Sequence, residues 1–120
     1  MADEIRVSVK FSFDKGGTEI VVNLSDLVTV TGNNCLHNRQ TVGTTEEALL
    51  LGDAGTGGYL VAVNRDATNF VELRSGTGAT DVVRLRAGEL ACFRVSPDAT
   101  APFVIADTAA VELEYWLIEA

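Results

Sequence analysis

The stretch that decides the fold is residues 5–13, which read IRVSVKFSF. Apolar side chains occupy every second position of this stretch, and polar side chains occupy the positions between them. Alternation with a period of two is typical of a strand that has one buried face and one solvated face. Residues 14–17, DKGG, then supply turn chemistry, and the alternation resumes over residues 18–24. Because glycine tolerates the positive φ of tight turns, this segment predicts a β-hairpin.

The same pattern recurs toward the C-terminus about every ten residues, which is the spacing typical of a β-sandwich or a small barrel. The predicted strands cover Tyr59–Asn64, Phe70–Arg74, Val82–Arg86, Leu90–Val95, Phe103–Ala106 and Val111–Glu119. Separators rich in glycine, proline, aspartate and asparagine lie between them. We therefore expect an all-β fold, an antiparallel and jelly-roll-like β-sandwich of about eight to ten short strands, as a single domain over residues 1–120.

The middle of the chain has a weaker pattern. Residues 31–42, TGNNCLHNRQTV, are polar, and we interpret them as a loop followed by a short strand from about Leu36. Residues 44–47, TTEE, resemble a helix capping box, but too few residues follow before Gly52 for a stable helix. We expect a strand or a single helical turn there.

Charge and hydropathy exclude several classes of partner. The net charge of -8 opposes binding to a phosphate backbone, so we expect no nucleic acid partner. No apolar run approaches the roughly 20 residues of a membrane helix, and the N-terminal stretch alternates where a signal peptide is continuously apolar. We therefore expect no membrane partner and synthesis in the cytoplasm. In a reducing cytosol, Cys35 and Cys92 should remain free thiols.

No group of residues predicts catalysis. His37 is the only histidine, whereas a closed zinc site needs four ligands and a catalytic triad needs a nucleophile turn, which is missing. The glycine-rich residues 52–58 and 75–80 lack the ending of a phosphate-binding loop and are expected to be hairpin turns. Asp53 and Asp66 lack a calcium-loop pattern. We expect no catalytic residue, no metal site and no cofactor, and therefore no enzyme.

Arginines are concentrated in three consecutive predicted strands. Between residues 72 and 94, four arginines meet three acids, a local charge of +1 that leaves -9 for the rest of the chain. Alternation predicts that these arginines share an outer face; they are Arg74, Arg84, Arg86 and Arg94. One interpretation is a solvated ladder paired with Glu72, and the other is a surface that docks onto acidic protein.

The last predicted strand departs from simple alternation. Trp116 and Ile118 fall on the same side as Glu112 and Glu114, so the C-terminal end of the strand has apolar side chains on both faces. Either the strand lies between two layers, or Trp116 and Ile118 contact another chain, where aromatic residues are enriched.

Three segments carry a resemblance to a known group of proteins. Residues 64–76 read NRDATNFVELRSG, residues 82–95 read VVRLRAGELACFRV, and residues 103–120 read FVIADTAAVELEYWLIEA. Together with HNRQTVGTTEEALLLG at residues 37–52, these segments resemble the sequences of small structural proteins of tailed bacteriophages. Among these proteins, capsid decoration (cement) proteins are the ones that this chain resembles most in size, acidity and strand pattern.

The resemblance implies a jelly roll on the outer surface of the virion capsid, made in the host bacterial cytoplasm. Such a protein would bridge subunits of the major capsid protein as a homo-oligomer, a trimer or a dimer. Candidate protein contacts are Ile5, Arg6, Arg74, Arg84, Arg86, Trp116 and Ile118. Alternatives are a phage neck, tail or fibre-attachment component and, from another class, a carbohydrate-binding jelly roll that stacks sugars on Trp116, Tyr59 and Tyr115.

Overall fold

Strands dominate the computed structural model, which describes residues 4–30, 32–54, 57–74, 78, 81–95 and 102–119, with the backbone alone at Asp53 and Gly57. The chain forms two compact units, Met1–Thr31 and Gly32–Ala120. The predicted single domain spans both of them. Each unit is described by itself below.

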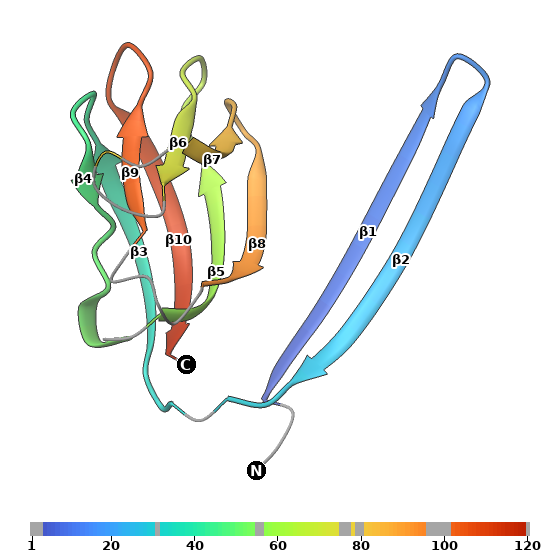
Figure 1. Cartoon of the computed structure of the whole chain (residues 1–120), viewed down its shortest axis with the longest axis horizontal. Coiled ribbons are helices and arrows are strands. Elements are labelled where there is room, and N and C mark those ends of the chain that lie inside the picture. Colours follow the sequence, from blue (N-terminus) through green and yellow to red (C-terminus); the bar gives the residue numbers. More distant parts are fainter. Residues whose placement is uncertain are drawn as a thin grey trace. The chain divides into compact units, whose positions relative to one another are not determined.

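The first unit is a long hairpin made of β1 (Ile5–Lys15) and β2 (Thr18–Val28) (Figure 1). Its ladder runs without interruption from the pair Ile5 and Val28 to the pair Lys15 and Thr18. Gly16 and Gly17 have φ of 61° and 84°, the two positive values that a two-residue type I′ turn requires. Because the turn needs only these two residues, both strands are longer than the alternation predicts.

The second unit is a sandwich of two four-stranded antiparallel sheets (Figure 1). One sheet has the order β3 (Cys35–Val42), β10 (Val111–Glu119), β5 (Gly57–Asn64) and β8 (Leu90–Arg94). The other has the order β4 (Glu47–Ala48), β9 (Phe103–Ala106), β6 (Val71–Arg74) and β7 (Asp81–Leu85). A three-residue 3₁₀ turn, η1 (Gly52–Ala54), precedes β5.

Strand pairing in the sandwich is nested. β3 pairs with β10, β4 with β9, β5 with β8, and β6 with β7. This is the connectivity of a long antiparallel hairpin rolled up into two sheets, which is the eight-stranded jelly roll. The predicted all-β, jelly-roll-like sandwich is therefore confirmed.

The predicted strands correspond closely to the observed ones. β9 and β10 have the predicted bounds, and β3 begins at Cys35, one residue before the expected Leu36. The stretch over residues 44–51 contains the two-residue strand β4 rather than a helical turn. The turns expected at residues 75–80 and after Val95 fall largely outside the described residues.

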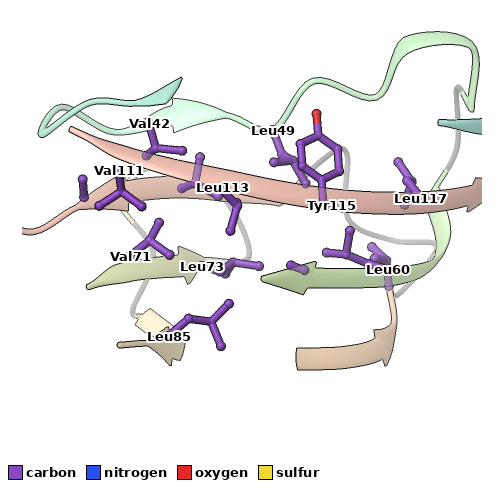
Figure 2. Packing of buried hydrophobic residues seen from close by; sticks show 14 of the residues in the cluster. Val42, Leu49, Leu60, Val71, Leu73, Leu85, Val111, Leu113, Tyr115 and Leu117 are labelled. Atoms are coloured by element: carbon purple, nitrogen blue, oxygen red, sulfur yellow. The ribbon is translucent and has the colours of Figure 1, made fainter. Parts of the chain in front are cut away.

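The core lies between the two sheets and is built by alternation. On β10 the buried side chains are Val111, Leu113, Tyr115 and Leu117, which follow one another along the strand in Figure 2. They pack with buried residues of the opposite sheet, including Val71, Leu73, Leu85 and Val104. The sandwich thus buries one face of each sheet, as alternation predicts.

Two buried polar groups tie loops to this core. Asn64 is fully buried; its Nδ2 donates to the carbonyl oxygens of Asn69 and Leu85, each at 2.9 Å, and its Oδ1 accepts the Asp66 amide at 2.8 Å. The Tyr115 hydroxyl donates to the Leu50 carbonyl at 2.5 Å. Among the described residues, every buried side-chain nitrogen or oxygen has a partner.

Candidate association surfaces

An apolar surface covers part of the outer face of the sheet β3–β10–β5–β8, on β10, β5 and β8. The ladder places Ile118 beside Tyr59, Trp116 beside Val61, and Val63 beside Leu90. These side chains alternate with the buried ones, so all of them point away from the core. We call this surface the outer patch, and it consists of Tyr59, Val61, Val63, Leu90, Trp116 and Ile118.

A stacked pair fixes the most prominent side chain of the outer patch. The rings of His37 and Trp116 lie 4.6 Å apart and within 5° of parallel. His37 sits directly across the ladder on β3, which brings the two rings together. Trp116 remains 37% exposed, so it is presented at the surface instead of lying between layers. The interpretation in which β10 has a layer on each side is therefore wrong for the second unit.

Glu114 links His37 to Arg65. Its Oε2 lies 2.7 Å from His37 Nε2, and its Oε1 accepts from Arg65 Nε at 2.8 Å. These hydrogen bonds, the one from His37 first, hold the pKa of Glu114 below its usual value. The three groups form a structured polar border beside Trp116. His37 thus has a structural role, which sequence reasoning could not assign because Glu114 lies far away along the chain.

Further polar groups lie at the margins of the outer patch. Arg94 on the edge strand β8 covers the Tyr59 ring, with its guanidinium carbon 5.0 Å from the ring centroid. Arg39 on the opposite edge pairs with Glu112 at 3.4 Å in solvent. Cys35 and Cys92 are free and exposed on the two edge strands. Charged side chains thus stand on both edge strands and also on the inner strand β10, where Glu114 lies beside Val63.

A second apolar surface lies on the hairpin. The register places Val9 opposite Leu24, Phe11 opposite Val22, and Phe13 opposite Ile20. We call this surface the arm face, and it consists of Ile5, Val7, Val9, Phe11, Phe13, Ile20, Val22, Leu24 and Val28. Five of these side chains are well exposed. The sequence predicts a buried face here; within its own unit, this face has no layer over it.

The opposite face of the hairpin is mainly polar. Ser8, Lys10 and Ser12 of β1 lie across from Ser25, Asn23 and Val21 of β2. Of the candidate contacts, Ile5 belongs to the arm face and Arg6 belongs to this polar face. Because Ile5 and Arg6 lie on opposite faces of the hairpin, they cannot both belong to one flat contact surface.

The arginines do not share one face. β6 and β7 belong to one sheet and β8 to the other, so Arg94 lies apart from Arg74 and Arg84, and the prediction of a common face is wrong. The sequence pattern could not reveal this because sheet membership depends on long-range pairing. Arg86 lies in the turn that leads to β8.

Arg74 and Arg84 are held by carboxylates on the second sheet. Arg84 pairs across the ladder with Glu72 at 2.9 Å and covers the Phe70 ring at 4.0 Å. Arg74 bonds to Asp81 and, at 2.5 Å, to Glu46, which raises the pKa of the guanidinium and lowers the pKa of both carboxyls. The predicted pairing with Glu72 is thus observed for Arg84.

No catalytic arrangement emerges from the described residues. They contain no cluster of three or more side chains suited to hold a metal ion. Asp66 caps its own loop, accepting the amides of Thr68 and Asn69, and these bonds lower the pKa of its carboxyl. Among the described residues, no helix has the length and hydropathy to cross a membrane.

The fold and its surfaces define the class of structure as a jelly-roll sandwich that follows a long hairpin. No protein-family profile and no curated protein matches this chain. Among solved structures, it is similar to a chain from work described as "Bacillus endospore appendages form a novel family of disulfide-linked pili", at 12% identity and a TM-score of 0.40, over 100% of this chain and 96% of that one. A likeness at this level supports no conclusion about the role of this chain.

Proposed function

We propose that this protein is a structural component that works by stoichiometric association with other protein subunits and catalyses no reaction. The observation that carries the proposal is the pair of apolar sheet surfaces, the arm face and the outer patch. Monomeric soluble proteins rarely expose contiguous apolar patches larger than a few hundred Å², and larger ones mark interaction sites. Association would remove this surface from water at a gain of roughly 25 cal/mol per Å².

The particular role we propose is that of a phage capsid decoration protein on the outer surface of the head. It would bind the major capsid protein and bridge its subunits, which stabilises the shell. Support comes from the sequence of residues 64–119, which resembles the sequences of small phage structural proteins. A neck, tail or fibre-attachment component is the alternative within the same resemblance, and it differs in copy number per particle.

Carbohydrate binding has less support from the surface. Tyr115 is fully buried in the core, so the expectation that it could stack on a sugar is wrong. One face of Trp116 is covered by His37, and Tyr59 lies under Arg94. Sugar recognition by stacking needs open aromatic faces, and these contacts reduce the available area.

Titration of expanded phage heads that lack a decoration protein tests the proposed role. Co-sedimentation should reach a plateau at a fixed ratio to the major capsid protein, and the saturated shells should open at a higher temperature. Bovine serum albumin at equal concentration is the control for trapping. Absence of co-sedimentation at saturating protein rejects decoration, and a plateau of a few copies per particle assigns the protein to the neck or tail.

A further inference from the structure

We infer that the arm face of one copy packs against the outer patch of a second copy, and that the second copy returns the contact with its own arm. The two chains would form a dimer by reciprocal exchange of arms. This inference names the partner of the two surfaces, and it stands whether or not the dimer decorates a capsid. Its basis is that one chain carries two apolar sheet faces, each of which has no layer over it within its own unit.

The dimensions of the surfaces favour a partner that contacts both. Each hairpin strand has 11 residues, so the arm face is about 37 Å long and, with two strands, about 10 Å wide, or on the order of 400 Å². The outer patch lies on three strands, β10, β5 and β8, and the outer face of the sheet that carries it spans four strands, which gives on the order of 500 Å² for that face. A single contact therefore buries about half of the roughly 800 Å² per partner that a standard interface needs.

Reciprocal exchange doubles that area, because every copy then buries its arm face and its outer patch. A contact between two arm faces would bury only half as much and would leave both outer patches in water. Sheets pack well face to face at a spacing of about 10 Å, the geometry already used inside the sandwich. A second copy of this chain is thus the occupant that satisfies the area requirement.

Charge is compatible with this packing. On the face of the hairpin that carries the arm face, Lys15 at the tip and Asp26 near the base are the charged side chains. The row at the centre of the outer patch, formed by His37, Trp116, Val61 and Cys92, holds no carboxylate, lysine or arginine. Glu114 lies on the same face beside Val63 and is already paired with His37 and Arg65, so few further ions lose water on contact. Arg94 at the edge has no carboxylate partner among the described residues, and Asp26 of the second copy can supply one.

The hairpin also needs such a cover for its own stability. An isolated two-stranded hairpin is at best marginally stable in water, and stability requires a further layer against its apolar face. The sheet β3–β10–β5–β8 of the second copy provides that layer. The outer face of the sheet β4–β9–β6–β7, where Arg74 and Arg84 lie, would then remain for a capsid.

Two substitutions, each with a matched control, test the inference by analytical ultracentrifugation. Leu24→Asp changes the arm face at a side chain that is 64% exposed, and Leu90→Asp changes the outer patch at one that is 68% exposed. The controls are Val21→Asp on the polar hairpin face, 59% exposed, and Val82→Asp on β7, 77% exposed. We expect a dimer for the unchanged protein and both controls, and dissociation constants raised roughly 100-fold or more by Leu24→Asp and Leu90→Asp.

Acrylamide quenching of Trp116, the only tryptophan, identifies which surfaces meet. Leu24→Asp lies on the other unit, and it should nevertheless increase quenching of Trp116, because it removes the arm of the second copy from the outer patch. Circular dichroism confirms that each variant keeps its strands.

Three results would overturn the inference. They are a monomeric unchanged protein at all concentrations, a dimer that persists in Leu90→Asp, and loss of the dimer in Leu24→Asp without a change in quenching. The second and third results would point to an arm-to-arm contact. Failure to bind capsids with an intact dimer would reject decoration alone.

Discussion

Asn64 shows how a single buried polar residue can organise a loop. Its side chain joins the start of the loop at Asp66 to the loop end at Asn69 and to Leu85 of β7. Since the side chain is fully buried and its bond to the Leu85 carbonyl lies in the interior, removal of the side chain leaves that carbonyl without a partner and also breaks the two part-buried bonds to the loop.

The substitution Asn64→Ala should therefore destabilise the sandwich by on the order of 3 kcal/mol, because buried groups left without partners cost about 1–3 kcal/mol each. Urea denaturation followed by circular dichroism measures the change. Asn23→Ala on the exposed hairpin surface is the control and should change stability by less than about 0.5 kcal/mol. Equal effects of the two substitutions would contradict the structural role of Asn64.

Glu114 gives the stability a dependence on pH. Its folded pKa is lowered by His37 and Arg65, so its contribution is fully present above the ordinary glutamate pKa and is lost as pH falls through the lowered value. Glu114→Gln should lower the melting temperature at pH 7, and the difference from the unchanged protein should shrink toward strongly acidic pH. Thermal melts at a series of pH values measure it.

Exposed Glu19 supplies the control for that series, since Glu19→Gln removes the same charge without disturbing His37 or Arg65. A difference for Glu114→Gln that stays constant from pH 7 to strong acid would show that the loss is one of packing and not of charge.

At the scale of elements, β10 is the strand on which the sandwich depends most. It lies inside its sheet between β3 and β5, and four of its side chains fill the core. Its outward side chains meanwhile build the outer patch. One strand thus supports both the core and the candidate surface.

Leu113→Ala removes a fully buried side chain from β10 and should cost about 2–5 kcal/mol, the range for cavities left by large core residues. Chemical denaturation gives the value. Val82→Ala, at an exposed position of β7, is the comparison and should cost far less. A cost for Leu113→Ala below that of Val82→Ala would be inconsistent with the packing in Figure 2.

At the scale of the whole molecule, arm exchange couples folding to assembly. A dimer whose hairpins are stabilised by the partner becomes more stable as its concentration rises, because association draws the equilibrium toward the folded state. When the dimer dissociates, the second copy no longer covers the arm face or the outer patch.

The melting temperature of the unchanged protein should accordingly rise by about 3 °C for each tenfold increase in concentration. Differential scanning calorimetry over two decades of concentration measures the slope. Leu24→Asp should melt at a temperature that does not depend on concentration, whereas Val21→Asp should keep the slope. A flat response of the unchanged protein would speak against the dimer.

Local pattern was sufficient for the strands and most of their limits. β9 and β10 coincide with their predicted bounds, and the turn at Gly16 and Gly17 lies where the glycines predict it. These features depend on side-chain alternation and on allowed φ values, which neighbouring residues set without help from the rest of the chain.

Local sequence pattern could not predict which residues distant in the sequence come into contact. The separation of β8 from β6 and β7, which divides the arginines, and the meeting of His37 with Glu114 both depend on which strands pair. The alternation of residues 5–13 likewise determined a strand with one apolar face, but the pattern does not specify which layer packs against that face. Only the tertiary structure showed that the core forms within residues 32–120 and that the arm face has no cover within its own unit, because pairing is a property of the folded sheets.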